Sequence, residues 1–269
     1  MSLLRFPDPY DFELSTGRFR AFGTELANRL VDLTLYREVG GREVRIVARP
    51  GGVDVEPLDA VTEPVIAQLL GMPFELGPFY EWAAHDTVLA PIVEGLRGFR
   101  PPLAPDPFES LVTSITAQQV SLFSATAMRN RMVERFGVRV GEAWAFPTRE
   151  RMASAEADEL YACGFSRRKG EYVIGLARAD LDLDGLAALD DDEVRASITA
   201  VRGLGPWTAE WFLARHLARP RAWPAGDLVL RKAADVLYGV EVTELGRRLD
   251  PFQNLSAHYL LVAFMTVPG

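Results

Sequence analysis

The sequence predicts a mostly helical protein that begins with a small α+β unit. Between about Leu33 and Leu58, apolar and polar residues alternate in short runs separated by glycine pairs, a pattern typical of antiparallel strands. After Pro64 the alternation ends, and helical stretches follow almost to the C-terminus. Prolines and glycines interrupt these stretches at 100–107, 147, 164, 203–206 and 220–226.

The strand runs are TLYREV, REVRIVARP and VDVEPL, and they are separated by Gly40-Gly41 and Gly51-Gly52. Glycine accepts the positive φ that a tight hairpin turn needs, so we expect these runs to form an antiparallel sheet. We expect a helical stretch near Arg20 to Arg29 to flank it. With 269 residues, the chain suits one large domain or two to three small ones that share a core.

Composition excludes several classes of protein. A single cysteine, Cys163, rules out an internal disulfide framework, a four-cysteine zinc site and an iron–sulfur cluster held by the chain's own thiolates. The three histidines are scattered, and none has metal-ligand spacing. The N-terminus lacks the features of a secretory signal, and no apolar run approaches the ~20 residues of a membrane span. We therefore expect a cytoplasmic, bacterial-type protein with no cofactor, no side-chain metal ligands and no membrane partner.

The net charge of −8 argues, taken alone, against nucleic acid as a partner, because phosphate contacts drive most such binding. The basic charge is local, however. The stretch from Arg202 to Gly239 holds six basic and three acidic residues in an otherwise acidic chain. Composition therefore neither supports nor excludes nucleic acid as a partner.

A helix, a tight turn and a second helix are predicted over 190–215. Asp190 with Glu193 fits a capping-box start, and Val194, Ile198 and Val201 form an apolar stripe behind it. The second helix begins at Pro206, a residue suited to the first helical position.

The turn itself is Gly203-Leu204-Gly205. Glycines let the chain reverse and leave bare backbone that a phosphate can approach, and the first amides of the next helix point outward as anion donors. Gly203, Gly205 and Thr208 are thus candidates to hold one DNA phosphate. An ordinary αα-corner, where glycine is also common, explains the turn alone equally well.

Asp227 follows the Pro/Gly-broken segment RPRAWPAGD and precedes the helical run LVLRKAADVL, so it occupies a helix N-cap. Most N-cap aspartates only satisfy backbone amides. The same geometry also suits catalysis, because helix amides and the helix dipole keep a carboxylate ionised when a substrate excludes water.

The hairpin, the Pro/Gly segment and Asp227 together resemble the helix–hairpin–helix–Gly/Pro–Asp superfamily of DNA glycosylases. DPFESLVTSITAQQVS (106–121) is similar to the family's segment that enters DNA, and CGFSRRKGEYVIGLA (163–177) to its Gly-x-x-x-x-Lys helix. The N-terminal PYDF and the β unit resemble more narrowly the DNA-3-methyladenine glycosylase II (AlkA-type) family. The resemblance covers nearly the whole chain.

The resemblance implies the helix–hairpin–helix DNA glycosylase fold, with a cleft between two helical domains. It divides the chain into an N-terminal α+β domain over 1–82, a central helical domain over 105–219, and a third helical domain. The third domain would be formed by 83–104 and 220–269 and would carry Asp227.

The resemblance also implies roles for individual residues. Trp207, Trp211 and Phe264 fall where the AlkA type has aromatic residues of the base pocket, although core packing explains them almost as well. Lys169 would bind DNA phosphate. Gln119 falls where the family places the residue that fills the gap left by the flipped base. The backbone of Gly203 and Gly205 would hold a monovalent cation.

The implied activity is monofunctional base excision from double-stranded DNA by a protein expected to be a monomer. A fixed carboxylate, here Asp227, would stabilise the positive charge that builds on the sugar as an alkylated purine of the 3-methyladenine or 7-methylguanine type departs. The damaged nucleotide must first be flipped out of the helix. Trp207 stands where bifunctional relatives carry a lysine nucleophile, so no Schiff base is expected by that route.

Two alternatives stay open: a non-catalytic helix–hairpin–helix DNA-binding protein, and a glycosylase for oxidised, deaminated or mismatched bases. The sequence also departs from the AlkA type. Leu228 follows the aspartate where an aromatic residue can stand, and Arg18 replaces an expected N-terminal aromatic, with Phe19 beside it. These departures predict a less aromatic pocket and a shifted range of lesions.

Overall fold

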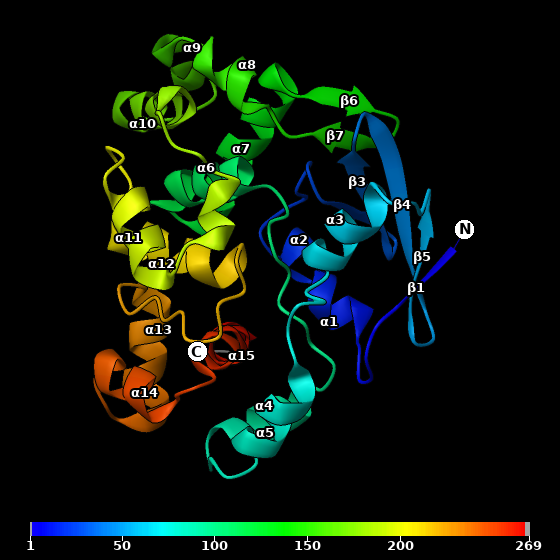
Figure 1. Ribbon diagram of the computed structural model, residues 1–269, viewed down its shortest axis with the longest axis vertical. Coiled ribbons are helices and arrows are strands. Elements are labelled where there is room, and N and C mark those ends of the chain that lie inside the picture. The colour runs from blue at the N-terminus through cyan, green and yellow to red at the C-terminus, as the bar shows by residue number, and fades with distance from the viewer. Residues whose placement is uncertain (1, 267–269) are drawn as a thin grey trace.

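The computed structural model describes residues 2–266 and places an N-terminal sheet beside a body of helices (Figure 1). The sheet has five strands in the order β1-β5-β4-β3-β2, and every neighbouring pair is antiparallel. The strands are β1 (Ser2–Arg5), β2 (Arg29–Val31), β3 (Thr34–Val39), β4 (Arg42–Arg49) and β5 (Gly52–Glu56). The predicted fold class is confirmed, and so are the three strands predicted from alternation.

The turn between β3 and β4 shows why these strands form where they do. Gly40 and Gly41 have φ angles of 61° and 77°, so both central residues lie in the left-handed region that a two-residue hairpin requires. This fixes Val39 opposite Arg42. Side chains along β3 then alternate between half-buried and buried, so one face of the sheet meets a core.

Three short helices cover that face: α1 (Phe12–Thr16), α2 (Arg18–Ala21) and α3 (Thr62–Leu69). Phe12, Phe19 and Ile66 pack into one cluster with the inward side chains of the strands. The helix expected near Arg20 to Arg29 is wrong beyond Ala21. The chain leaves α2 through Gly23, at φ 95°, and residues 29–31 instead pair with β3 as an edge strand.

The helical body contains most of the remaining elements. Its helices are α4 (Leu76–Ala83), α5 (Leu89–Gly95), α6 (Pro107–Ala117), α7 (Leu122–Phe136), α8 (Arg149–Ala153), α9 (Ala157–Ala162), α10 (Arg167–Arg178), α11 (Asp191–Thr199), α12 (Pro206–Arg215), α13 (Leu228–Ala233), α14 (Val242–Arg248) and α15 (Gln253–Thr266). A 3₁₀ turn spans Gly185–Ala188, and a π-helical turn, Ala234–Tyr238, continues α13. One continuous cluster of buried side chains joins these helices. The final three residues of the predicted third domain lie outside the described residues.

The expectation that strands end after Pro64 is wrong at one place. Strands β6 (Val138–Val140) and β7 (Ala143–Ala145) form a small hairpin around Gly141, which has a φ of 62°. The hairpin follows α7 and lies against β3, so it extends the contact between the sheet and the helices. Within the described residues, every helix is too short or too polar to span a lipid bilayer.

A buried ion pair fastens the sheet to the helical body. Arg37 on β3 donates to both carboxylate oxygens of Glu109 on α6, at 2.9 and 2.5 Å, and both side chains are less than a tenth exposed. Arg37 also donates to the carbonyl of Ala27 and to the side chain of Asn28. This bidentate geometry fixes the position of α6, which leads into the candidate site, relative to the N-terminal unit.

We expect Arg37→Met to lower the free energy of unfolding by about 3–5 kcal/mol, because Glu109 then stays buried without its counter-charge. The exposed pair between Arg42 and Asp59, at 2.7 Å, provides the control: Arg42→Met should change stability by less than about 1 kcal/mol. Urea unfolding of both variants measures the difference. Equal losses in the two variants would contradict a special role for the buried pair.

Candidate active site

The predicted hairpin is present and joins α11 to α12. Asp190 caps α11 by accepting from the amides of Asp192 and Glu193, and the Glu193 side chain accepts from the amide of Asp190 in return. The predicted capping box is thereby confirmed. Gly203 has a φ of 94°, and a Cβ there would lie 2.2 Å from the ring of Tyr172 on α10. Glycine is therefore required at this position by both conformation and space.

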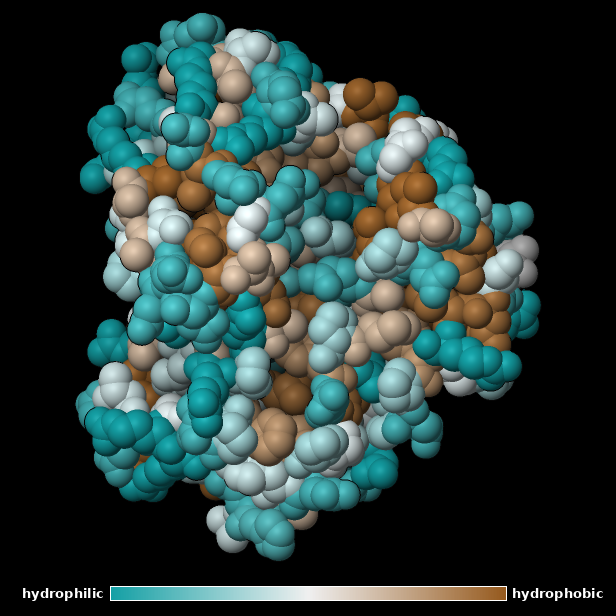
Figure 2. All heavy atoms as spheres, viewed as in Figure 1, coloured by the Kyte–Doolittle hydropathy of each residue, from teal (hydrophilic) through white to brown (hydrophobic). Residues whose placement is uncertain are grey.

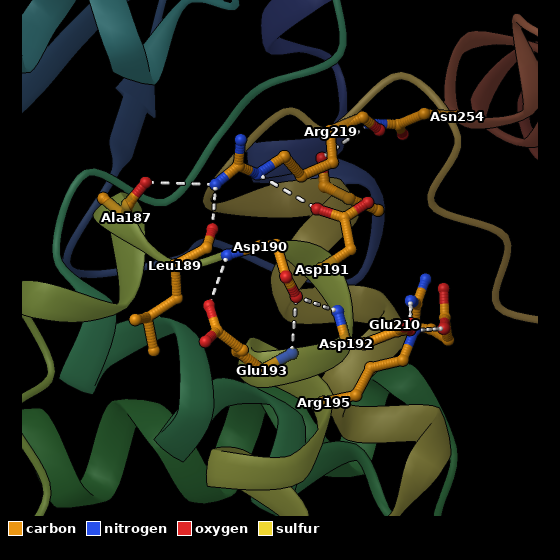
Figure 3. A network of polar contacts seen from close by, with 11 residues as sticks. Ala187, Leu189, Asp190, Asp191, Asp192, Glu193, Arg195, Glu210, Arg219 and Asn254 are labelled. Carbon is orange, nitrogen blue, oxygen red and sulfur yellow. Dashed lines mark hydrogen bonds and ion pairs between the residues drawn. The ribbon is translucent and has the colours of Figure 1, made fainter.

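A network of polar contacts holds the two hairpin helices and the segment after them together (Figure 3). Arg195 on α11 donates to Glu210 on α12 at 2.6 Å, and the other oxygen of Glu210 accepts from the amide of Trp223 at 3.0 Å. Arg219 binds the carbonyls of Ala187 and Leu189 ahead of α11. The segment that leads to Asp227 is thus tied to the hairpin rather than free to move.

Asp227 ends that segment and caps α13, as predicted. Its Oδ1 accepts from the amides of Val229 and Leu230, at 2.9 and 3.1 Å. Its Oδ2 accepts from the indole N–H groups of Trp207 and Trp211, both at 3.2 Å. Four donors therefore fix the carboxylate in one orientation, and both tryptophans come from the second helix of the hairpin.

Trp211 is held in place from its other side by Arg215. The Arg215 guanidinium lies 3.5 Å from the centre of the Trp211 ring, and the ring of His258 meets Trp211 edge-on at 5.7 Å. Burial and the nearby Arg18 guanidinium hold the pKa of Arg215 well below its usual value, while Asp227 opposes them. Burial, with Arg215 and Arg18, likewise lowers the pKa of His258 well below its usual value, so its imidazole is neutral.

The surface is hollowed between the N-terminal unit and the helical body (Figure 2). Arg18 on α2 belongs to the N-terminal unit, yet Asp227 and Arg215 of the helical body act on its charge. Leu228, directly after the carboxylate, is 64% exposed. Asp227 itself is half-buried.

The loop before α7 carries the candidate gap-filling residue. Gln119 is exposed and has a φ of 55°, an uncommon left-handed conformation for a residue with a side chain. Its neighbour Gln118 donates to the carbonyl of Gly203 at 3.0 Å, which places this loop beside the hairpin. Exposed apolar side chains surround Gln119 in the sequence: Val120, Leu122 and Phe123. Phe123 also meets Phe22 of the N-terminal unit edge-on at 5.5 Å.

The structure does not bring every predicted site residue to the cleft. Trp211 is 2% exposed, so it lies beneath the carboxylate and has no open face for a base to stack on. Trp207 is half-buried at the carboxylate. Phe264 is half-buried on α15, and among the described residues no ring contact joins it to either tryptophan.

The residues predicted to bind phosphate differ in whether a phosphate could reach them. Gly205 is open, since a Cβ there would meet nothing within 4 Å. Thr208 is 1% exposed and its amide donates to the Gly205 carbonyl, so neither group is available to a phosphate. Lys169 donates to the carbonyl of Thr116 at 3.0 Å, and burial lowers its pKa. Its ammonium joins α10 to the end of α6 instead of facing solvent.

The backbone carbonyls expected to hold a monovalent cation already accept hydrogen bonds within the protein. The Gly205 carbonyl accepts from the amides of Thr208 and Ala209, so it is committed to α12. The Gly203 carbonyl already accepts from Gln118. Among residues 2–266, no three His, Cys, Asp or Glu side chains lie close enough together to hold a metal ion.

Sequence reasoning missed several residues at this site. Gln118, which holds the hairpin, carries no local signal because its partner Gly203 is 85 residues away in the sequence. Arg215 stacks on Trp211, four residues earlier on the same helix, so this pair could have been predicted from its spacing. Arg168 and Arg202 lie on the ring of Tyr172 beside the hairpin, at 5.6 and 5.9 Å. These two arginines add basic charge where the open glycine lies.

Residues 112–249 match the model of the HhH-GPD superfamily of base excision DNA repair proteins. The matched segment covers the hairpin, the connecting segment and Asp227 within the geometry described above. The chain belongs to this superfamily.

Individual relatives agree with that assignment. A DNA-3-methyladenine glycosylase of Bacillus subtilis is 30% identical over 201 residues, which span 69% of this chain and 66% of that protein. DNA-3-methyladenine glycosylase 2 of Escherichia coli is 27% identical over 94% of both chains. The structure of a 3-methyladenine DNA-glycosylase from Archaeoglobus fulgidus superposes with a TM-score of 0.89 over 99% of both chains, at 24% identity, which shows a shared fold.

We expect Trp211→Phe to lower kcat for base release about tenfold, because one of the two indole donors to Oδ2 is lost and hydrogen bonds to charged groups are worth about 1.5–3 kcal/mol. Binding to DNA should stay within twofold. Trp82→Phe, on α4 and outside this network, controls for loss of an indole. A fall in DNA affinity with kcat unchanged would contradict the positioning role of Trp211.

We expect Gly205→Val to fold normally, since the added side chain enters open space, but to bind duplex DNA about tenfold more weakly whatever its sequence. The bulk would keep a phosphate from the backbone amides of Gly205 and Trp207, the two at this end of α12 that do not donate to the Gly205 carbonyl. Gly77→Val, which also enters open space on α4, is the control. Titrations with several unrelated duplexes test this, and a loss confined to particular sequences would count against phosphate binding.

Proposed function

We propose that this protein is a monofunctional DNA glycosylase that hydrolyses the N-glycosidic bond of alkylated purines during base excision repair. The observation that carries the proposal is the Asp227 carboxylate, held by two helix amides and two indole N–H groups at the hairpin. The superfamily supplies DNA as the partner. The names of the relatives from B. subtilis and E. coli point to 3-methyladenine as the type of damaged base.

The geometry suggests how the chain's residues would act. As the glycosidic bond lengthens, positive charge develops on the sugar, and a preorganised carboxylate stabilises it without having to reorient. Water then adds to the sugar carbon, and its proton leaves with the base or the solvent. The hydrogen-bonding capacity of Asp227 facing the protein is taken up, so its remaining lone pairs are free for the sugar or the water.

Hydrolysis without strand cleavage is part of the proposal. A lyase step needs an amine that forms a Schiff base with the sugar. Trp207, which stands where bifunctional relatives carry that lysine, donates an indole N–H to the carboxylate and supplies no nucleophile. The Lys169 ammonium donates to the carbonyl of Thr116 on α6, so its amine is engaged there.

The base-release experiment tests the substrate class. Purified protein is incubated with methylated DNA and, separately, with duplexes that contain 8-oxoguanine, and the released bases are identified by mass spectrometry. We expect 3-methyladenine and 7-methylguanine to be released and the abasic strand to stay intact. Release of 8-oxoguanine alone, or strand scission with borohydride trapping, would replace this proposal with a glycosylase for oxidised bases.

Asp227→Asn separates an enzyme from a binding module. Asparagine still caps a helix well, so the fold and DNA affinity should survive, whereas base release should fall on the order of 10³-fold. Single-turnover assays with methylated DNA, alongside thermal melting, provide the measurement. Asp235→Asn, farther along the same helical segment, controls for loss of one negative charge. Unchanged release in Asp227→Asn would refute the catalytic role of this carboxylate, whereas no release by the wild-type protein would favour a non-catalytic DNA-binding module.

A further inference from the structure

Two arginines share one tyrosine ring beside the hairpin turn. The guanidiniums of Arg168 and Arg202 lie 5.6 and 5.9 Å from the centre of the Tyr172 ring. Arg168 also donates through its Nε to the hydroxyl of Tyr172, one turn further along α10. Both arginines are exposed, whereas Tyr172 is half-buried. The ring therefore holds two solvent-facing cations near one another.

The ring of Tyr172 also packs against the turn itself. A Cβ on Gly203 would lie 2.2 Å from the nearest ring atom, so the ring contacts the glycine backbone. Arg202 directly precedes Gly203 in the sequence. Gly205, at the other end of the turn, has open space where a side chain would stand. The two cations thus lie on the Gly203 side of the turn, and the open backbone lies on the Gly205 side.

Protein carboxylates balance the charge of this pair only in part. Glu171 lies 3.6 Å from Arg202, but the two side chains are 51% and 80% exposed, and such a pair contributes little to stability. Within residues 2–266, Arg168 has no carboxylate partner. Two like charges within 6 Å of one ring centre repel each other, and an anion that both can reach relieves this repulsion. The arrangement therefore favours an anionic ligand.

We propose that Arg168 and Arg202 form a binding site for a DNA phosphate, next to the phosphate that the open backbone at Gly205 would hold. A guanidinium suits this ligand because it donates two parallel hydrogen bonds to phosphate oxygens. The superfamily supplies duplex DNA as the partner that carries such phosphates. The inference deepens the proposed function and rests on it only in that DNA is bound, whichever base is released.

Such a site addresses how an acidic chain can bind DNA. The net charge of −8 repels phosphates as a whole, so attraction must come from basic side chains gathered at one place. A phosphate contact carries no sequence information, but it fixes the register of a protein along a strand. Because α12 carries the two indoles that bind Asp227, the register of the hairpin also sets where this carboxylate meets the strand.

The double variant Arg168→Met/Arg202→Met tests the site by titration with an undamaged duplex at several salt concentrations. We expect affinity to fall about tenfold at low salt, and the slope of log affinity against log salt to become shallower by about 1, the value for one phosphate contact. Glu171→Gln should bind about two- to threefold more tightly, because it removes the acid that competes with phosphate for Arg202.

Arg97→Met is the matched control. The Arg97 guanidinium lies 5.5 Å from the centre of the Tyr80 ring and 3.8 Å from Glu94, so it has the same kinds of partner as Arg202. It follows α5, which lies at the opposite end of the molecule from α10 (Figure 1). Its affinity and salt slope should equal those of the wild-type protein. Melting curves show that each variant is folded.

A second measurement locates the phosphate. Duplexes with an abasic-site analogue carry one uncharged methylphosphonate linkage, moved step by step along the strand. Wild-type protein should lose affinity at adjacent linkages, and the double variant should become insensitive at one of them while staying sensitive at its neighbour. The same sensitive linkages in both proteins, or none in the wild-type protein, would overturn the proposed site.

The titrations decide the inference separately from the function. An unchanged affinity or salt slope in the double variant overturns it, and so does an equal loss in Arg97→Met. Weaker binding by Glu171→Gln would also contradict it. Both measurements report binding alone, so a protein that releases no damaged base would refute the proposed glycosylase activity without affecting the outcome for this site.

Discussion

The arrangement of this site depends on one carboxylate that is hydrogen-bonded from two directions. Helix amides of α13 bind one oxygen of Asp227, and two indoles of α12 bind the other. Each set constrains one torsion of a short side chain, and together they leave no freedom of rotation. The N-cap that starts a helix and the group that would meet the sugar are therefore the same atoms, so folding of α13 and preparation of the site are one event.

That arrangement requires α12 and α13 to hold a fixed relation, although a long irregular segment separates them. The Glu210 carboxylate helps to fix this relation, because it accepts hydrogen bonds from Arg195 of the preceding helix and from the backbone amide of Trp223. Asn254 of α15 binds the carbonyls of Ala214 and Arg219 from the other side. The hairpin, which is the candidate surface for DNA phosphate, is thus also the scaffold that aims the two tryptophans.

Features of this structure that depend on a few consecutive residues could be predicted from the sequence, whereas contacts between distant segments could not. The glycine turns, the capping box at Asp190 and the N-cap at Asp227 are properties of a few consecutive residues, and all were predictable. Strand β2, in contrast, exists because β3 lies beside it, and its three residues have no pattern of their own. The resemblance predicts a pocket role for Trp211, and neither it nor the helical spacing reveals that the buried ring contacts both Asp227 and Arg215.

The same limit explains Arg18. In the sequence it is an arginine where the resemblance to the AlkA type leads us to expect an aromatic residue, which by itself says only that something differs. In the fold, the charges of Glu25, Arg129 and Asp227 act on Arg18, and Glu25 is itself paired with Arg129 at 3.3 Å. Which charges surround a side chain is decided by the packing of segments that are far apart in sequence, so this part of its environment cannot be predicted from its own segment.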